Sequence, residues 1–364
     1  MGISGKLIIS VFVILIGGII FYFSKSKTAS SFSETKNEEE TIKQSLIRNR
    51  VAKKVKIICR QENLVSEEYE RYILVREDYL NKSVEVVIET VRIPKGVFQM
   101  GGRPDSLAEA CWTIANMPSY WVKLSDDYYM GKYQVTNAQY ATFLNAKGIP
   151  QDGKWRSGTY PNEVLIKDSS TERGNLHGGG NSDNRGLNWN GSTWVPVSGR
   201  ENHPVIYVTW FGADEYARWV GGKLPTEAQW ERACRAGTIT DWATATGEED
   251  DLTDYAWYSA NSSYDSPDYG TKPVGKKKAN LYGLYDMHGN VYEWCLDQWN
   301  NYPSGTTEDT PIPDPIGTSD TDTTRMLRGG AWCFNGPYSC SAYRCGASPD
   351  IASNHYGFRV VFVS

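Results

Sequence analysis

The sequence predicts an irregular, loop-rich domain in which short strands and short helices alternate. Of its 364 residues, 34 are Gly and 13 are Trp, a combination that favours tight turns held together by aromatic packing. Helical periodicity is scarce after residue 90. A chain of this length that is 40% hydrophobic can bury one large core or two smaller ones. The net charge of -5 and the lack of a basic stripe argue against nucleic acid as a partner.

An uncharged apolar run extends from Leu7 to Phe23 and is flanked by Lys6 and Lys25. Its length is close to the minimum for crossing a bilayer. We therefore expect residues 1–27 to form a single-pass transmembrane helix that anchors the protein in a membrane through residues 7–23. The large domain is expected outside the cytoplasm. A cleaved signal peptide is the alternative, although no small-x-small cleavage site follows the run.

Residues 28–90 are rich in mixed charges and are interpreted as a charged stalk or small spacer. The simplest expectation for this stretch is a solvated helix followed by a strand at SVEVVIETV, residues 83–91. From Val91 the composition shifts to dense Gly, Trp and Tyr. One domain is therefore expected over residues 91–364.

The first part of this domain contains clear strand and helix signals. VRIPKGVFQMGG, residues 91–102, predicts a strand, a turn and a second strand. YYMGKYQVTNAQYATFLNAKG, residues 128–148, predicts a strand that ends at Val135 and a helix capped by Thr136. The apolar face of that helix would contain Tyr140, Phe143 and Leu144.

A second region, residues 203–237, predicts a buried strand followed by two helices. The first helix begins near Trp210 and turns its small and aromatic residues inward. In the second helix, Pro225 and Thr226 occupy N-terminal positions, and Glu227 lies near the positive end of the helix dipole.

These motifs resemble the formylglycine-generating enzyme family, also called sulfatase-modifying factors. The matching stretches, in the family's order, include YYMGKYQVTNAQY (128–140), HPVIYVTW (203–210), KLPTEAQWERACRAG (223–237), YGLYDMHGNVYEW (282–294) and RGGAW…GFR (328–359). The resemblance covers about residues 91–364. It implies an irregular α+β fold with low regular secondary structure, related in architecture to C-type lectins.

In the family's oxidases, a cysteine pair in a GGSY-x-C-x(4)-C stretch binds copper and converts a sulfatase cysteine, within Cys-x-Pro-x-Arg, to formylglycine. Soft thiolates suit Cu(I). Here the matching stretch contains Cys333 and Cys340 at a different spacing. Counted forward from Gly330, the family's two positions fall on Phe334 and Ser339; counted back from residues 343–345, the second falls on Cys340. We assign no catalytic residue; Cys333 and Cys340 are the pair to consider if the protein is a copper-dependent oxidase. A disulfide between these two cysteines is left open by the sequence.

The resemblance also implies a structural calcium site in YDMHGNVYEW. Carried over residue by residue, the ligands would be Asp286, Gly289, Val291 and Glu293. Calcium binds oxygen ligands, and loop carbonyls with carboxylates would supply them. A turn capped by Asn290, without an ion, is the alternative.

The final motif of this family also serves as a display scaffold in diversity-generating retroelements. In those systems AAY codons become NNY codons, which cannot encode Met, Trp, Gln, Lys or Glu, and none of these residue types occurs between Cys333 and Tyr356. Apparent fixed points at Ala342, Arg344, Pro349–Asp350 and Gly357–Arg359 separate runs of unrelated residues. The predicted ligand-binding residues are Cys333, Phe334, Asn335, Tyr338, Ser339, Tyr343, Cys345, Gly346, Ala347, Ser348, Ile351, Ala352, Ser353, Asn354, His355 and Tyr356.

The sequence therefore predicts a membrane-anchored, non-catalytic display protein that binds an unidentified protein or cell-surface ligand through its C-terminal residues. Tyr, Ser, Asn and Gly suit adaptable binding surfaces. Two alternatives stay open: a copper-dependent formylglycine-generating oxidase acting on sulfatase cysteines, and a structural envelope protein.

Overall fold

The computed structural model describes residues 10–16, 19–25, 50–61, 64–76, 85–102, 119–171, 185–262 and 269–363, with the backbone alone described before residue 86. The chain divides into two compact units. The first comprises Met1–Lys53 and Leu74–Leu80, and the second comprises Lys54–Ile73 and Asn81–Ser364.

In the first unit, the apolar run forms an antiparallel pair of strands, β1 (Ser10–Ile16) and β2 (Ile19–Lys25). The transmembrane helix expected over residues 7–23 is thus not observed. The sequence here is rich in Val, Ile and Phe, which favour extended backbone, and it contains a Gly-Gly pair typical of two-residue hairpins. Across the described ranges, no helix combines the length and apolar character needed to cross a bilayer.

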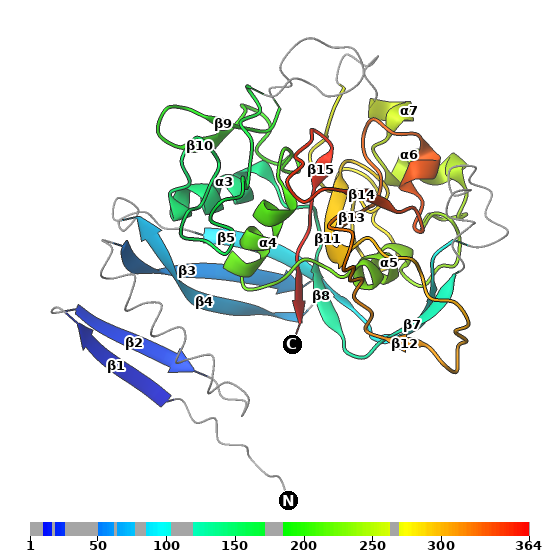
Figure 1. The fold of residues 1–364 in the computed structure, drawn as a ribbon, viewed down its shortest axis with the longest axis horizontal. Coiled ribbons are helices and arrows are strands. Elements are labelled where there is room, and N and C mark those ends of the chain that lie inside the picture. The colour runs from blue at the N-terminus through cyan, green and yellow to red at the C-terminus, as the bar shows by residue number, and fades with distance from the viewer. Residues whose placement is uncertain are drawn as a thin grey trace, which may run out of the picture. The chain divides into compact units, whose positions relative to one another are not determined.

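A five-stranded sheet, most of whose residues belong to the second unit, has the order β16-β8-β5-β3-β4 (Figure 1). Its strands are β3 (Arg50–Gln61), β4 (Leu64–Arg76), β5 (Glu85–Ile93), β8 (Tyr128–Gly131) and β16 (Val361–Val363). The strand predicted at residues 83–91 is confirmed by β5. The solvated helix expected before it is wrong for residues 50–61 and 64–76, which are strands. The β-branched residues Val55, Ile57 and Ile58 favour this extended form.

A second sheet has three strands, and a separate hairpin has two. The three strands are β6 (Gly96–Met100), β7 (Tyr120–Leu124) and β12 (Ile312–Pro313), and the hairpin consists of β9 (Leu187–Trp189) and β10 (Trp194–Pro196). The strand, turn and strand predicted for residues 91–102 are confirmed by β5 and β6.

The predicted helices are present, and the first of them begins after its predicted cap, Thr136. They are α3 (Asn137–Lys147), α4 (Trp210–Trp219) and α5 (Glu227–Arg235). Thr136 and Gln139 form a reciprocal capping box at the start of α3, and Tyr140, Phe143 and Leu144 are fully buried. Short helices among the described residues are η3 (Glu249–Asp251), α6 (Leu252–Tyr255), α7 (Ser259–Ser262) and η4 (Gly336–Ser339).

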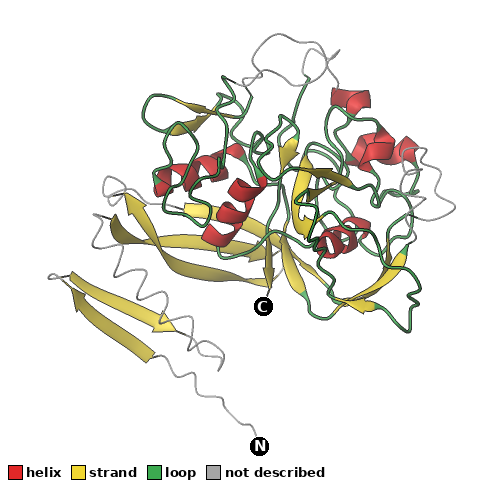
Figure 2. Ribbon diagram, viewed as in Figure 1, coloured by secondary structure: helices red, strands yellow, loops and turns green. Residues whose placement is uncertain are grey.

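The buried strand expected before α4 does not form. Pro204 and Val208 make isolated bridges only. Tyr207, between them, has a left-handed φ of 61°, which interrupts extended backbone. Loops connect most elements of the second unit (Figure 2), as the Gly-rich composition predicts.

A four-stranded sheet carries the C-terminal motifs, in the order β14-β13-β11-β15. Its strands are β11 (Tyr292–Gln298), β13 (Arg325–Arg328), β14 (Cys345–Ala347) and β15 (Tyr356–Gly357). β11 runs antiparallel to β13 and parallel to β15. Because β14 and β15 are the two edges of this sheet, the segments around residues 345 and 356 are placed on either side of β11 and β13.

Candidate functional site

The predicted ligand-binding residues lie in three segments around the four-stranded sheet. Exposed or half-exposed members are Cys333, Phe334, Asn335, Tyr338, Tyr343, Cys345, Gly346, Ala347, Ser348, Ile351 and Tyr356. Buried members are Ser339, Ala352, Ser353, Asn354 and His355. The exposed members can contact a partner directly, whereas the buried ones shape the backbone beneath them.

Five of these side chains make a continuous set of ring contacts. The centroids of Phe334 and Tyr338 are 5.7 Å apart, and those of Tyr338 and Tyr343 are 5.2 Å apart. His355 lies 5.3 Å from Phe334 and 4.6 Å from Tyr356. Most of these contacts are edge-to-face, the arrangement that aromatic quadrupoles favour. We call Phe334, Tyr338, Tyr343, His355 and Tyr356 the aromatic face.

Tyr292, on β11, is the floor of the aromatic face, and sequence reasoning missed it. Its side chain is 2% exposed, and its ring lies 5.3 Å from Phe334 and 6.4 Å from Tyr356. Burial raises the pKa of the Tyr292 hydroxyl well above its ordinary value. Strand alternation places Tyr292 and Trp294 toward Tyr356 and Glu293 toward the opposite face. That alternation in YEW is the signal that identifies it.

The cysteines of this region do not form the expected pair. Cys340 is fully buried and disulfide-bonded, whereas Cys333 and Cys345 are half-exposed and are not in a disulfide. The disulfide between Cys333 and Cys340 that the sequence left open is therefore not present. Phe334 and Ser339, at the positions where the family's cysteines fall, supply a ring of the aromatic face and a buried hydroxyl.

Buried arginines hold the backbone between the exposed runs. Arg344 donates from Nε to Glu227 Oε1 at 2.6 Å and from Nη2 to Glu227 Oε2 at 2.9 Å. Arg328 donates to the carbonyls of Ala342 at 2.9 Å and Tyr343 at 2.8 Å. Tyr343 and Cys345, on either side of the buried Arg344, are half-exposed. The fixed points at Ala342 and Arg344 are thus buried, and exposed and buried residues alternate.

The other fixed points differ from one another. Phe358 and Arg359 are fully buried, and Arg359 donates to Glu293 at 2.7 Å and 2.8 Å. Asp350 is exposed and accepts a hydrogen bond from Ser348. The Pro349 backbone carbonyl accepts a hydrogen bond from the Trp210 N–H at 3.0 Å.

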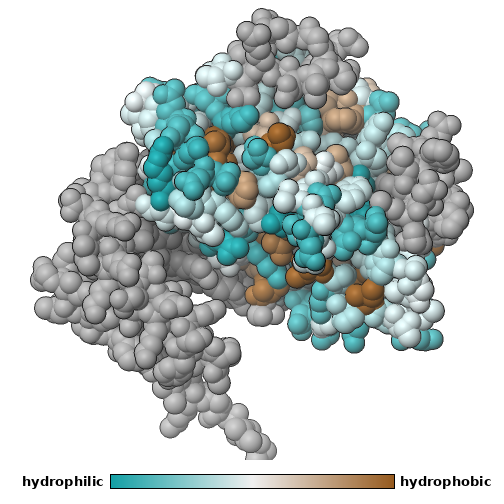
Figure 3. All heavy atoms as spheres, viewed as in Figure 1, coloured by the Kyte–Doolittle hydropathy of each residue, from teal (hydrophilic) through white to brown (hydrophobic). Residues whose placement is uncertain are grey.

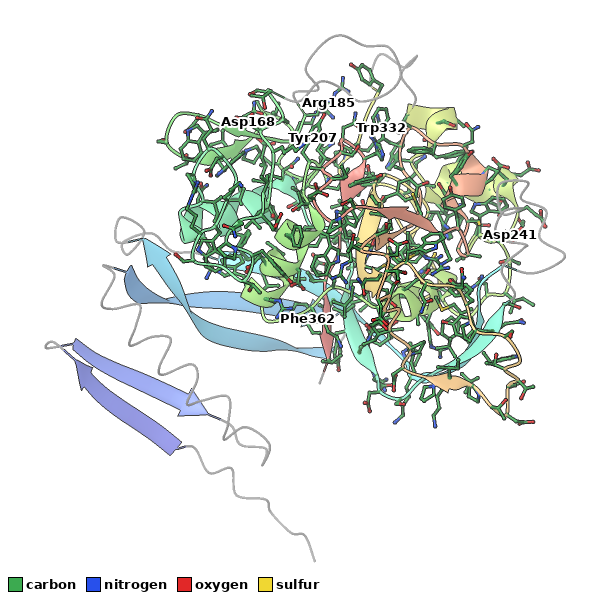
Figure 4. The ribbon with its side chains drawn as sticks, viewed as in Figure 1. Asp168, Arg185, Tyr207, Asp241, Trp332 and Phe362 are labelled. Atoms are coloured by element: carbon green, nitrogen blue, oxygen red, sulfur yellow. The ribbon has the colours of Figure 1, made fainter. Side chains whose placement is uncertain are left out.

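Trp332, labelled in Figure 4, joins the end of the motif at residues 282–294 to the segment 351–356. Its backbone N–H donates to Asn290 O at 3.0 Å. Its indole Nε1 donates to Asn354 O at 3.1 Å, and its carbonyl accepts from Ser262 Oγ at 2.9 Å. The segment that precedes β15 is therefore fixed from inside the domain.

A cavity of about 240 Å³ borders the Arg344–Glu227 pair, with Asp297 and Tyr302 in its wall. Asp297 accepts the Gly317 N–H at 2.7 Å and the Glu227 N–H at 2.8 Å. Burial raises the pKa of Asp297 to about 7. Large exposed apolar side chains are scattered over the described part of the chain, and Figure 3 shows apolar colour in small separate areas.

The four residues predicted as calcium ligands lie together. Backbone carbonyls of Asp286, Gly289 and Val291 and the carboxylate of Glu293 surround one atom, Nε2 of Gln134. Sequence reasoning missed Gln134, which lies far from them in the chain. In the described ranges, no group of three or more His, Cys, Asp or Glu side chains could hold a metal ion. Calcium binding here stays a prediction.

Comparison with known proteins shows related sequences and folds. The formylglycine-generating enzyme of Streptomyces coelicolor is 33% identical over 286 residues, covering 74% of this chain and 87% of that protein. PvdO from Pseudomonas aeruginosa has a TM-score of 0.54 at 24% identity, covering 76% and 94% of the two chains. The Treponema denticola variable protein 1 has a TM-score of 0.52 at 22% identity, covering 76% and 95%.

The mixed helix and strand fold is thus similar to the folds of PvdO and of the Treponema denticola variable protein 1. Residues 76–363 match the sulfatase-modifying factor enzyme 1-like domain. The chain belongs to this family, as its motifs predict.

Proposed function

We propose that this protein is a non-catalytic ligand-binding display protein whose diversified surface is centred on the aromatic face. The alternation of burial along residues 342–345 carries the proposal. Ala342 and Arg344 are held in the interior, and Tyr343 and Cys345 reach the surface. Such a segment tolerates replacement of its exposed side chains, because its position depends on the buried ones.

The chemistry of the aromatic face suits recognition. Its rings supply large contact areas at low entropic cost, and tyrosine hydroxyls add hydrogen-bonding groups. Asn335, Ser348 and Ile351 lie exposed on the same segments, so polar and apolar contacts are both available. A folded protein or a cell-surface ligand is the partner that this surface fits.

The state of the cysteines supports a non-catalytic role. Copper-dependent oxidation needs two accessible soft thiolates facing one ion. Cys340 is occupied by a disulfide, and burial raises the pKa of the Cys345 thiol, which disfavours its thiolate. Cys333 is a half-exposed thiol outside a disulfide, and its spacing from Cys340 differs from that of the family's cysteine pair.

The central test is the DNA sequence of the codons for residues 333–356 in sister lineages, together with a search for a near-copy template beside a reverse transcriptase. We expect variation at Asn335, Tyr338, Cys345 and Ile351 and none at Arg344. Equal variation at the codons of buried residues and of exposed residues would contradict the division of this segment into anchoring and exposed residues. Invariant codons without a template would favour a structural envelope protein or an enzyme.

The second candidate is a formylglycine-generating oxidase that uses Cys333 and Cys340 with copper. The observation that favours it is the 33% identity to a formylglycine-generating enzyme over most of both chains. A Cys-x-Pro-x-Arg peptide incubated with copper-loaded protein and oxygen separates the two functions. Mass spectrometry should find the peptide unchanged. Formation of formylglycine by the wild type but not by Cys333→Ser would overturn the display function.

We also propose membrane anchoring through residues 7–23, with the second unit outside the cytoplasm. The support is the uncharged apolar run between lysines. The full chain should stay in the membrane pellet after alkaline extraction, and protease added to intact cells should degrade the second unit. Release of the full chain into the soluble fraction would refute the anchor.

A further inference from the structure

Four oxygen atoms converge on a single side-chain nitrogen in the interior. Gln134 Nε2 lies 2.9 Å from Glu293 Oε1, 3.2 Å from the carbonyls of both Gly289 and Val291, and 3.3 Å from that of Asp286. A carboxamide nitrogen carries two hydrogens, so four acceptors exceed what it can satisfy. Several carbonyls and a carboxylate directed at one point form the environment that proteins build around a hard cation. We call these four oxygens the oxygen cage.

The backbone that forms the oxygen cage is held from outside. Asp286 and Asn290 have left-handed φ values of 58° and 66°, which turns successive carbonyls toward one side of the loop. Asn290 accepts from the Lys272 N–H at 2.9 Å and donates to the Lys272 carbonyl at 3.0 Å. A Cβ at Gly289 would collide with the Trp257 carbonyl. The carbonyls therefore point inward because of packing elsewhere, whatever occupies the centre.

The charge of Glu293 is balanced within the protein. Arg359 donates to Oε2 at 2.7 Å and to Oε1 at 2.8 Å, and the Trp230 indole donates to Oε2 at 2.8 Å. The side chains of Glu293 and Arg359 are completely buried. Because Arg359 already balances the negative charge of Glu293, a neutral N–H donor at the centre of the oxygen cage is sufficient.

A calcium ion does not fit this arrangement. Calcium would sit about 2.3–2.6 Å from each oxygen, and the Gln134 nitrogen occupies that volume. Gln134 is 1% exposed, so its carboxamide would have to leave a buried position. We infer that the Gln134 carboxamide takes the place of a cation in the oxygen cage, so that the loop at residues 286–293 is stabilised without metal.

The same geometry implies a latent metal site. Gln134 Oε1 and Asp286 Oδ1 are buried and have no hydrogen-bond partner among the described residues. Replacing the carboxamide by a carboxylate of equal size removes the N–H donor at the centre of the oxygen cage and adds an anionic oxygen. With the unpartnered Asp286 oxygen nearby, Gln134→Glu should need a divalent cation to fold stably.

The test compares thermal unfolding of the full chain in excess EGTA and in millimolar Ca²⁺. We expect the same Tm for the wild type under both conditions. Gln134→Glu should have a lowered Tm in EGTA and a Tm that Ca²⁺ raises, since a ligand that binds only the folded state stabilises it. Terbium luminescence should report one bound ion per chain in the variant and none in the wild type.

Gln139→Glu is the matched control. Gln139 is a partly buried carboxamide that donates to Val87 O at 2.7 Å and lies outside the oxygen cage. This variant should lose stability without any response to Ca²⁺. A wild-type Tm that rises with Ca²⁺ would overturn the inference, and so would a folded Gln134→Glu that ignores Ca²⁺. If Gln134→Glu fails to fold in either condition, the wild-type measurement decides alone.

Discussion

Arg344 and Glu227 form a buried bidentate ion pair that links the C-terminal binding segment to the start of α5. The two N–O distances are 2.6 Å and 2.9 Å. The Arg344 guanidinium also lies 4.0 Å from the ring centroid of Tyr302. The pair fixes the backbone between Tyr343 and Cys345, so the position of the exposed residues of this segment depends on a buried contact.

Arg344→Leu should destabilise the protein by about 3–5 kcal/mol, because it leaves the Glu227 carboxylate buried without its main partner. Chemical denaturation of the full chain measures the change in the free energy of unfolding. Lys278→Ala is the control, since Lys278 and Asp254 form an ion pair that is largely exposed. That control should cause no resolvable change. Equal effects of the two variants would contradict the anchoring role of Arg344.

Neighbouring positions should differ sharply in tolerance. A library with NNY codons at Asn335, Tyr338 and Cys345 should yield mostly folded, protease-resistant protein, because these side chains reach solvent. The same codons at Arg344 and Arg359 should yield mostly unfolded protein, because both arginines pair with buried carboxylates. Limited proteolysis of the two pools provides the comparison. Similar resistance in both pools would contradict the division into exposed and anchoring residues.

The disulfide of Cys340 should survive replacement of Cys333. Peptide mapping without reductant should find Cys340 in a linked peptide and Cys333 as a free thiol that alkylates readily. Cys333→Ser should leave the linked peptide unchanged, whereas Cys340→Ser should abolish it and lower the Tm. A peptide joining Cys333 to Cys340 would be inconsistent with the structure.

The stability difference between Asp297→Asn and the wild type should depend on pH. Burial raises the pKa of Asp297 from 3.8 to about 7 in the folded state. Between these values the folded state binds more protons than the unfolded state. Asp297 therefore raises the free energy of unfolding as pH falls from about 7 toward about 4. The Asn variant lacks this increase in stability. Its stability relative to the wild type should therefore be highest near pH 8 and fall toward pH 5, as urea titrations at roughly these values would show; parallel pH profiles would contradict the assignment.

Local sequence signals predicted the regular elements well where the determinants are short-range. Thr136 with Gln139, and Thr226 with Gln229, are capping sequences whose hydrogen bonds form within one helical turn. The strand before α4 was wrong because Tyr207 adopts a left-handed conformation that apolar patterning does not reveal. Residues 50–61 are strand because β5 offers a parallel partner at Lys56–Gln61, and pairing with a distant segment is not visible in a charge-rich stretch.

The sequence predicted which segment contains the candidate site. The structure added the residues from other elements that contact this segment. The residue types of 333–356 indicated a binding surface, yet the buried floor, Tyr292, lies on a different strand. The predicted metal ligands do lie together, and the group at their centre, Gln134, comes from a segment more than a hundred residues away in the chain. No spacing rule within residues 286–293 could indicate that an amide nitrogen fills the position.

The sequence by itself determined the family and the cap at Thr136, and it indicated the segment that we propose as the binding surface, because these depend on motifs and on short-range hydrogen bonds. Only the tertiary structure decided which cysteine is in a disulfide, which side chains of residues 333–356 reach solvent, and which atom occupies the oxygen cage. Those outcomes depend on burial and on contacts between distant segments such as Arg344 with Glu227. Local sequence carries little information about such long-range packing.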